Sequence, residues 1–329
     1  MRRIGEVAMG AVPCDPLVGD GAIAIPTGGM LPQGADAVVM AEDTIEAGAW
    51  IEVRRAVQRG ENLVSAGEDV KAGAIVVRRG DLIGCGVQGV LSTLGITEFE
   101  VCAPSIGVIS TGDEILPAST AKLPPGFVRD ANSHIVTSVL KQYGFGAKFL
   151  GIVRDDREVL QESVTAALKD CDVLLLSGGS SVGTRDHATA VMESMGDPGL
   201  LVRGINMIPG KPTLIAGARD SHKLVVGLPG HPLSCLVTSL FVLLPLLLEM
   251  IGAADAQIGK HLVMPLAEDV LGRTGPEEFI PMRIVGDAVT PIAAKSGYVS
   301  TMNGCDGFIR LPQETETLRR GQEARIWIW

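Results

Sequence analysis

Glycine-rich loops follow several short apolar runs in this 329-residue chain. The clearest is DVLLLSGGSSVGTRDH, residues 172–187, where an apolar run leads into glycines and serines and then into Asp186. Such a loop lets backbone N–H groups approach a phosphate closely, and a helix that follows adds the positive end of its dipole. These loops therefore predict a site for a phosphorylated ligand.

Carboxylates accompany these loops. Glu114 comes shortly after the run IGVIS, Asp155 follows FLGIV, and Asp186 ends the loop that follows DVLLL. Carboxylates and phosphates repel each other unless a cation lies between them, and Mg²⁺ binds both kinds of oxygen. The pattern indicates a metal-assisted reaction on a phosphorylated small molecule.

The same loop contains the spacing G-x-S-x-G, from Gly179 through Ser181 to Gly183, which raises the alternative of a serine hydrolase. A nucleophile elbow needs its serine on a sharp turn directly after the strand. Here the apolar run stops at Leu176, so Ser181 lies five residues after it, too deep in the loop for an elbow. The chain also lacks G-x-G-x-x-G and Walker A patterns, which disfavours dinucleotide and P-loop sites.

The elements that must position these loops lie in residues 104–253. The runs IGVIS, AKFLGIV, DVLLLS and KLVVGL are typical of buried parallel strands. Amphipathic helical patterns lie between them, the first with Asn132 or Ser133 as its N-cap. This alternation predicts a three-layer α/β domain, which binds ligands beyond the carboxyl ends of its strands.

The flanking segments differ in character. Short apolar runs broken by glycine and proline predict a β-rich domain over residues 1–70, and a connecting segment with one short helix follows at 71–103. Residues 254–329 return to β-like patterns and predict a small β-barrel. The apolar stretch 233–251 contains Pro245 and Glu249, so we expect a buried helix and no membrane span.

The composition excludes some classes of function. Apolar residues make up 46% of the chain, charged residues 20%, and the net charge is −10, which fits a globular protein that is not a general nucleic-acid binder. Six widely spaced cysteines without C-x-x-C indicate reduced, packed thiols in a cytoplasmic protein.

A family resemblance runs in order along nearly the whole chain. The segments IPTGGMLPQGADAVVMAEDT, IGVISTGDEI, LLSGGSSVGTRDH, PGKPTLIA, GLPGHPLSCLVTSLFVLLPLLLEMIG and KSGYVSTMNGCDGFIRLP resemble the molybdopterin molybdenumtransferase (MoeA-like) family. The resemblance implies a multi-domain protein, usually a homodimer, whose α/β domain binds molybdopterin. Members use Mg²⁺ and molybdate to convert adenylylated molybdopterin into molybdenum cofactor with release of AMP, and contact with the molybdopterin adenylyltransferase is implied too.

The resemblance also assigns residues. The implied catalytic residues are Thr27, Asp69, Glu114, Asp155, Asp186 and Ser296, with Asp155 and Asp186 as metal ligands. The implied molybdopterin-binding residues are Thr111, Gly112, Ser177, Gly178, Gly179, Ser180, Gly183, Pro209, Gly210, Lys211, Pro229 and Gly230. Read without the resemblance, Thr27 is a turn hydroxyl and Asp69 a surface turn residue.

The chain departs from the family pattern in several places. The family's N-terminal Asp-Gly-Tyr-Ala motif lies upstream of where this chain begins, so we expect one catalytic carboxylate to be absent and the homodimer to be weakened. Gly204, Ile208 and Pro281 stand where the family has basic residues, and His231 stands where it has asparagine.

An oxyanion site needs donors, and three nearby cations offer substitutes: Arg203, Lys211 and Arg283. Two functions therefore stay open. One is a working molybdenumtransferase of divergent form, which the retention of motifs along the chain favours. The other is a non-catalytic carrier of molybdopterin or its cofactor, which the loss of basic positions favours.

Overall fold

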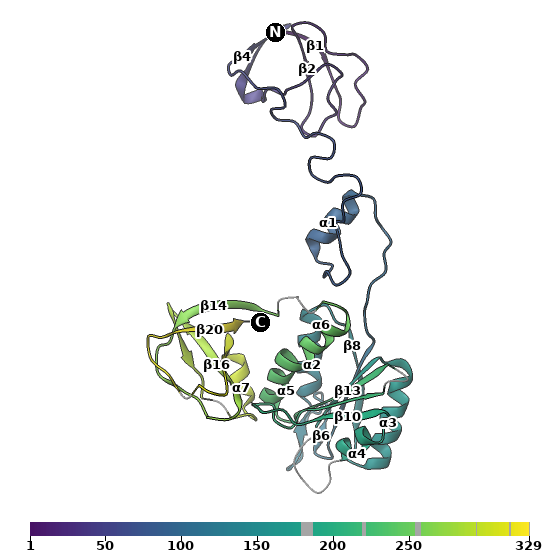
Figure 1. Ribbon diagram of the computed structural model, residues 1–329, viewed down its shortest axis with the longest axis vertical. Coiled ribbons are helices and arrows are strands. Elements are labelled where there is room, and N and C mark those ends of the chain that lie inside the picture. The colour runs from purple at the N-terminus through teal and green to yellow at the C-terminus, as the bar shows by residue number, and fades with distance from the viewer. Residues whose placement is uncertain (179–186, 219–221, 254–257, 294, 316, 329) are drawn as a thin grey trace. The chain divides into compact units, whose positions relative to one another are not determined.

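The chain forms two compact units, Met1–Val76 and Val77–Trp329, in the computed structural model (Figure 1). The structure describes residues 1–178, 187–218, 222–253, 258–293, 295–315 and 317–328. Each unit is considered by itself below.

The first unit is β-rich, as its short apolar runs predict. Its sheet has the order β2-β1-β4-β3, with β1 and β2 parallel and the other pairs antiparallel. The strands are β1 (Arg2–Glu6), β2 (Gly21–Ala24), β3 (Thr44–Ala47) and β4 (Trp50–Val53), and the 3-10 helix η1 (Ala41–Asp43) precedes β3.

The second unit begins with the short helix α1 (Cys85–Thr93) and continues into a six-stranded sheet of order β10-β12-β13-β9-β5-β8. The four predicted runs are its parallel strands: β5 (Ile106–Thr111), β8 (Ala147–Val153), β9 (Val173–Ser177) and β13 (Lys223–Leu228). The antiparallel strands β10 (Pro198–Arg203) and β12 (Leu214–Ala218) extend one edge. The expectation of full burial is wrong for β8, because it is the opposite edge strand and exposes Phe149 and Leu150.

Helices cover both faces of this sheet, which confirms the three-layer prediction. One face packs against α2 (Asn132–Gln142), α5 (Pro232–Thr238) and α6 (Leu244–Met250). The other packs against α3 (Arg157–Asp170) and α4 (His187–Glu193). The Asp156 side chain caps α3 by accepting the N–H groups of Glu158 and Val159.

The α5 helix continues through a π-helical turn (Ser239–Leu243) into α6, so that Pro232–Met250 is one apolar helix. It is long and apolar enough to cross a membrane, but 67% of its most apolar 18-residue window is buried inside the protein. Leu240, Leu243 and Leu247 lie in the core, as the prediction of a buried helix requires. Pro245, which has no N–H to donate, lies two residues after the π turn, in the first turn of α6.

The C-terminal sheet has the order β11-β16-β18-β20-β14, and β17 also pairs with β16. Its strands are β11 (Met207–Ile208), β14 (Lys260–Pro265), β16 (Glu277–Val285), β17 (Ala288–Pro291), β18 (Gly307–Leu311) and β20 (Glu323–Ile328). An isolated bridge between Leu266 and Val289 joins the two edges, so the sheet curls as the predicted barrel requires. The helix α7 (Val299–Asn303) and the strand pair β15 (Val270–Leu271) and β19 (Thr317–Leu318) complete it.

One short strand between β10 and β12 belongs to the second sheet. The strand β11, directly before residues 209–212, pairs in parallel with β16 of the C-terminal sheet. After β10 the chain leaves the first sheet, contributes β11 to the second, and returns as β12. A run of two strand residues gives no signal for its sheet, because pairing is set by the tertiary fold.

The six cysteines are free thiols. Burial raises the pKa of Cys235 to about 12 and that of Cys305 to about 11, so both stay protonated. These two and the buried Cys171 behave as packed thiols. Cys14, Cys85 and Cys102 are exposed, so the expectation that most of the cysteines are packed holds for only half of them.

Candidate active site

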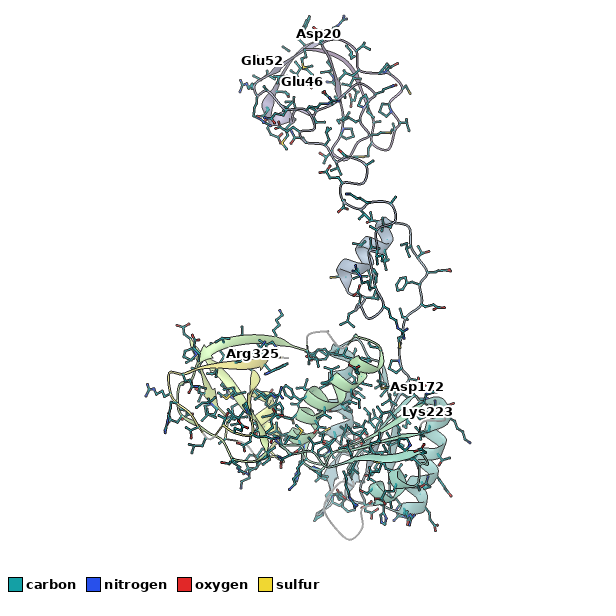
Figure 2. The ribbon with its side chains drawn as sticks, in the orientation of Figure 1. Asp20, Glu46, Glu52, Asp172, Lys223 and Arg325 are labelled. Carbon is teal, nitrogen blue, oxygen red and sulfur yellow. The ribbon has the colours of Figure 1, made fainter. Side chains whose placement is uncertain are left out.

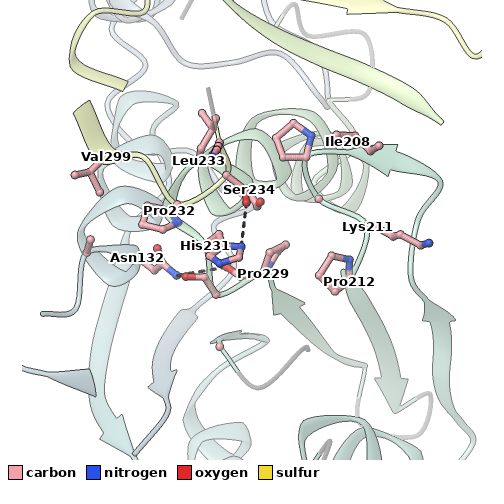
Figure 3. A pocket seen from close by; sticks show the side chains of 18 of the residues that line it. Asn132, Ile208, Lys211, Pro212, Pro229, His231, Pro232, Leu233, Ser234 and Val299 are labelled. Atoms are coloured by element: carbon pink, nitrogen blue, oxygen red, sulfur yellow. Dashed lines mark hydrogen bonds between the residues drawn. The ribbon is translucent and has the colours of Figure 1, made fainter. Parts of the chain in front are cut away.

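A cavity of about 1260 Å³ lies at the carboxyl ends of β5, β9 and β13, between the α/β sheet and the C-terminal sheet (Figure 3). Many residues that were predicted for the site line this single cavity: Thr111, Gly112, Glu114, Asp155, Gly178, Pro209, Gly210, Lys211, Pro229, Gly230 and Ser296. The predicted convergence of loops at one sheet edge is therefore observed.

Two glycine-rich loops meet at this edge with no side chain between them. Gly178 has φ +108°, and a Cβ there would overlap the carbonyl oxygen of Thr111. A Cβ on Gly230 would lie only 3.7 Å from the Cα of Gly178. The Gly178 N–H donates to the Leu228 carbonyl over 3.3 Å. Glycine at these two positions therefore lets the backbones of the loops approach each other and the end of β5 closely.

Two buried threonines contact the backbone of the loop that carries Lys211. Thr213 Oγ1 donates to the Gly210 carbonyl over 2.7 Å, and Thr238 Oγ1 lies 3.5 Å from Thr213 Oγ1. Gly210 has φ +127°, and a Cβ there would lie 2.9 Å from Thr238 Oγ1. Lys211 itself is exposed and lines the cavity. The buried contacts thus fix the backbone from which the ammonium group extends.

The amino-terminal end of α2 forms another wall. The buried Asp130 carboxylate accepts a hydrogen bond from Ser110 Oγ over 2.8 Å and from the Ser133 N–H over 3.1 Å. Asn132 or Ser133 was expected to cap this helix, but neither side chain does. The Asn132 Nδ2 donates to the carbonyls of Gly230, at 2.8 Å, and Pro229, at 3.4 Å. Asp130 caps the helix instead, and Asn132 holds the second glycine-rich loop.

The C-terminal part contributes the opposite wall through Ser296. Its hydroxyl lies 3.1 Å from Nδ1 of His231, and its carbonyl accepts the Leu233 N–H over 3.1 Å. These bonds join the segment around Ser296 to the start of α5. Glu278, also in this wall, is buried and accepts the Arg273 N–H over 2.8 Å, with the Arg273 guanidinium 3.6 Å away.

Both kinds of charge line the cavity. Its carboxylates belong to Glu114, Asp130, Asp155 and Glu278, and its cationic side chains are Arg129, Lys211, Arg273 and Lys295. In the described part of the chain no carboxylate lies within ion-pair distance of Lys211 or Lys295. These two ammonium groups are available to an anionic ligand.

The carboxylates suit a hard cation and not a zinc-type site. Among the described residues no group of three His, Cys, Asp or Glu side chains could hold a metal ion. Mg²⁺ needs no such cage, because it keeps several waters and binds one or two carboxylates together with substrate phosphates. Asp155 and Glu114, lining the same cavity, provide that donor set.

Three family descriptions match successive parts of the chain: "MoeA N-terminal region (domain I and II)" at residues 2–95, "Probable molybdopterin binding domain" at 107–249, and "MoeA C-terminal region (domain IV)" at 263–329. The chain belongs to the MoeA family.

Relatives and a solved structure of the same family are similar to this chain along nearly its whole length. The chain is 34% identical over 324 residues to a molybdopterin molybdenumtransferase of Staphylococcus epidermidis, covering 97% of this chain and 76% of the relative. It is 31% identical over 338 residues to the Bacillus subtilis protein of the same name, covering 98% and 76%. A crystal structure of a MoeA protein from Pyrococcus horikosii is similar with a TM-score of 0.77 and 33% identity, covering all of this chain and 81% of that one.

The remaining predicted residues either do not line the cavity or lie outside the described part of the chain. Thr27 and Asp69 lie in exposed turns of the unit Met1–Val76, within the part that matches the MoeA N-terminal region. Ser177 is buried one residue before Gly178 and does not line the cavity. The other predicted positions lie outside the described residues: Gly179, Ser180, Gly183 and Asp186.

The expected substitute cations are mostly misplaced. Arg203 pairs with Glu193 at 3.6 Å, and the Arg283 Nε donates to the Gly304 carbonyl over 2.9 Å; neither lines the cavity. Only Lys211 of the three does. Lys295, which the sequence analysis missed, lines the cavity beside Ser296 in the MoeA C-terminal region. No spacing in the sequence marks it, since its role depends on how the two sheets pack.

Proposed function

We propose that this chain is a molybdopterin molybdenumtransferase that acts in molybdenum cofactor biosynthesis. It takes adenylylated molybdopterin and molybdate, releases AMP, and leaves molybdenum on the dithiolene of the molybdopterin. The observation that carries the proposal is the cavity in which two glycine-rich loops meet the carboxylates of Glu114 and Asp155 and two lysines, Lys211 and Lys295, that have no ion pair with the described residues. The names of the relatives from Staphylococcus epidermidis and Bacillus subtilis support it.

The residues of the cavity have different proposed roles, which follow from the chemistry of their side chains and backbone. The loops around Gly178 and Gly230 take the ligand against the main chain, and Lys211 binds its anionic part. Asp155 and Glu114, with Asp186, hold Mg²⁺, which when bound offsets the negative charge of the phosphates that separate. Ser296, held by His231, is oriented to hydrogen-bond an oxyanion.

The same proposal extends to other predicted site residues. Gly112 and Thr111 end β5 at the cavity, and Pro209, Gly210 and Pro229 line it beside Lys211. Thr27 and Asp69 complete the catalytic set from the N-terminal part of the chain, and Ser177, Gly179, Ser180 and Gly183 complete the molybdopterin-binding loop.

At the level of the whole molecule, we propose four domains: 1–70, 71–103, 104–253 and 254–329. We further propose a cytoplasmic homodimer that receives its substrate from the molybdopterin adenylyltransferase. Sedimentation of the purified chain, alone and mixed with that enzyme, tests both associations.

A second function, a non-catalytic carrier, is favoured by one observation. Ile208 and Pro281 both line the cavity, at positions where the family resemblance leads us to expect cations. A carrier would bind molybdopterin or its cofactor in the same cavity without releasing AMP.

The decisive experiment measures AMP release. Purified protein is incubated with adenylylated molybdopterin, molybdate and MgCl₂, and AMP is quantified by chromatography. We expect AMP to form only when molybdate and Mg²⁺ are both present, and removal of Mg²⁺ with EDTA to abolish it, because the anhydride phosphates need a counter-charge. Tight binding of molybdopterin without molybdate-dependent AMP would instead establish the carrier.

A further inference from the structure

His231 and Ser296 form a hydrogen bond that joins the start of α5 to the C-terminal part of the chain. The Nδ1 atom of His231 lies 3.1 Å from Ser296 Oγ (Figure 3). Both residues line the cavity. In the proposed function the Ser296 hydroxyl donates to an oxyanion, but a hydroxyl has only one hydrogen to donate. The state of the imidazole therefore decides where that hydrogen points.

The main chain holds both partners of this bond in place. His231 directly precedes α5, with φ −74° and ψ 131°, and its carbonyl accepts the Cys235 N–H over 2.9 Å. The Ser296 carbonyl accepts the Leu233 N–H over 3.1 Å. A Cβ on Gly297 would lie 3.7 Å from His231 Cδ2, so the ring packs against this segment. The contact is thus set by two anchored backbones and not by two free side chains.

The His231 ring has no other polar partner among the described residues. It makes no cap bond to the N–H groups of α5. The titratable and charged groups on the elements packed against it are Asp130 and His134 on the side of α2, and Lys295 and Tyr298 on the side of α7. In the described part of the chain none of these four is bonded to the ring. The charge of His231 is therefore open to control by an anion in the cavity.

The direction of the bond follows from the protons on the ring. An imidazole without a proton on Nδ1 accepts the Ser296 O–H, which turns the hydroxyl hydrogen away from a ligand. A charged imidazolium carries a proton on both nitrogens, so Nδ1 donates to Ser296 Oγ and the hydroxyl hydrogen is released to donate to an anion. The neutral tautomer with its proton on Nδ1 gives the same direction without the charge. A nearby oxyanion favours the charged form, because opposite charges attract.

We propose that His231 is a positioning residue that, with a proton on Nδ1, aims the Ser296 hydroxyl at a tetrahedral oxyanion. The anion and the proton then bind together, and each strengthens the binding of the other. The ligand class is a dianion such as molybdate. This inference rests on the proposed function, because it assigns the control of the oxyanion donor in the same site.

The first test titrates the protein with molybdate by calorimetry between about pH 6 and pH 8, where histidine changes charge and molybdate stays a dianion. We expect wild type to bind molybdate about 5- to 10-fold more tightly at the lower pH. His231→Asn keeps an amide that can donate to Ser296 Oγ but cannot titrate, so its affinity should change by less than about 2-fold.

His134→Gln is the matched control for the first test. His134 is an exposed histidine near the start of α2, and it does not line the cavity. Its variant should keep the wild-type pH profile. A wild-type profile in His231→Asn, or a wild type that binds no molybdate, would overturn the role of His231.

The second test asks whether His231 acts through Ser296. Ser296→Ala removes the hydroxyl and keeps the carbonyl that accepts the Leu233 N–H. We expect it to bind molybdate more weakly and to lose most of the pH dependence. Calorimetry in buffers of different ionisation enthalpy should show proton uptake on molybdate binding in wild type, and almost none in Ser296→Ala or His231→Asn.

Two outcomes of the second test separate the possible failures. A wild-type pH profile in Ser296→Ala would mean that His231 acts by its charge alone, which would refute the positioning role and leave the proposed function intact. Molybdate is titrated here without molybdopterin. Proton-linked molybdate binding without AMP release would therefore refute the proposed transferase activity and support the pairing of His231 with Ser296.

Discussion

Lys295 adds a cation to the cavity wall that the sequence analysis did not predict. Its ammonium lies 5.7 Å from the centroid of the Tyr298 ring, it lines the cavity, and it is adjacent to Ser296. We predict that Lys295→Ala weakens pyrophosphate and molybdopterin binding about 10-fold at low ionic strength, because an unpaired cation that binds phosphate is lost. Calorimetry at several salt concentrations should show the difference shrinking as salt rises, since Lys295 is exposed.

Lys260→Ala serves as the control for this change. Lys260 begins β14 in the same C-terminal sheet, is exposed, and does not line the cavity. Equal losses in the Lys260 and Lys295 variants would mean that only overall charge matters.

Single residues also show where sequence reasoning stops. Thr111, Gly178 and Pro229 were predictable, because each follows an apolar strand and parallel strands end at one edge. Asn132 was taken for a helix cap, yet it bonds to carbonyls 97 and 98 residues away, which no local pattern encodes. Ser296 came from the family resemblance alone, since its place beside His231 depends on the packing of two sheets.

At the scale of elements, one carboxylate joins the amino-terminal ends of three strands through hydrogen bonds and an ion pair. These ends lie at the edge of the sheet opposite the cavity. Asp172, at the start of β9, accepts hydrogen bonds from the Ser105 N–H at 2.8 Å and Oγ–H at 2.7 Å, just before β5. Its other oxygen lies 3.4 Å from Nζ of Lys223, at the start of β13 (Figure 2). The Ser105 backbone N–H, with the Ser105 hydroxyl and Lys223, lowers the pKa of Asp172.

A lowered pKa gives a defined pH dependence. The ionised carboxylate stabilises the fold at pH values above its unfolded pKa of about 3.9, and this contribution is lost as pH falls through the lower folded pKa. We therefore predict that Asp172→Asn costs about 1 kcal/mol of unfolding free energy at pH 7, a modest value because the side chain is partly exposed. Urea titrations should show the deficit shrinking below about pH 4, while pterin affinity stays unchanged.

Asp170→Asn is the matched control, because this exposed carboxylate at the end of α3 has no hydrogen bond or ion pair among the described contacts. A deficit of the same size in Asp170→Asn, or one independent of pH, would contradict the role of Asp172.

Strands β5, β9 and β13, which Asp172 joins, were predictable from their apolar runs. The assignment of β11 to the second sheet was not, since two strand residues carry too little pattern.

At the scale of the whole molecule, every residue that lines the cavity lies in the unit Val77–Trp329. That unit also has its own hydrophobic cores on both faces of the α/β sheet and inside the curled C-terminal sheet. A part of a chain with its own core is expected to fold by itself. The cavity should then be complete without residues 1–76.

We therefore predict that a chain of residues 77–329 folds and binds molybdopterin with an affinity within about 2-fold of the full chain. Its circular dichroism and melting curve would show folding, and calorimetry would give the affinity. AMP release is expected to fall, because the proposed catalytic residues Thr27 and Asp69 are removed. Retained binding with lost AMP release would separate the two functions along the chain. A folded fragment that binds no molybdopterin would show that the cavity alone does not make the binding site.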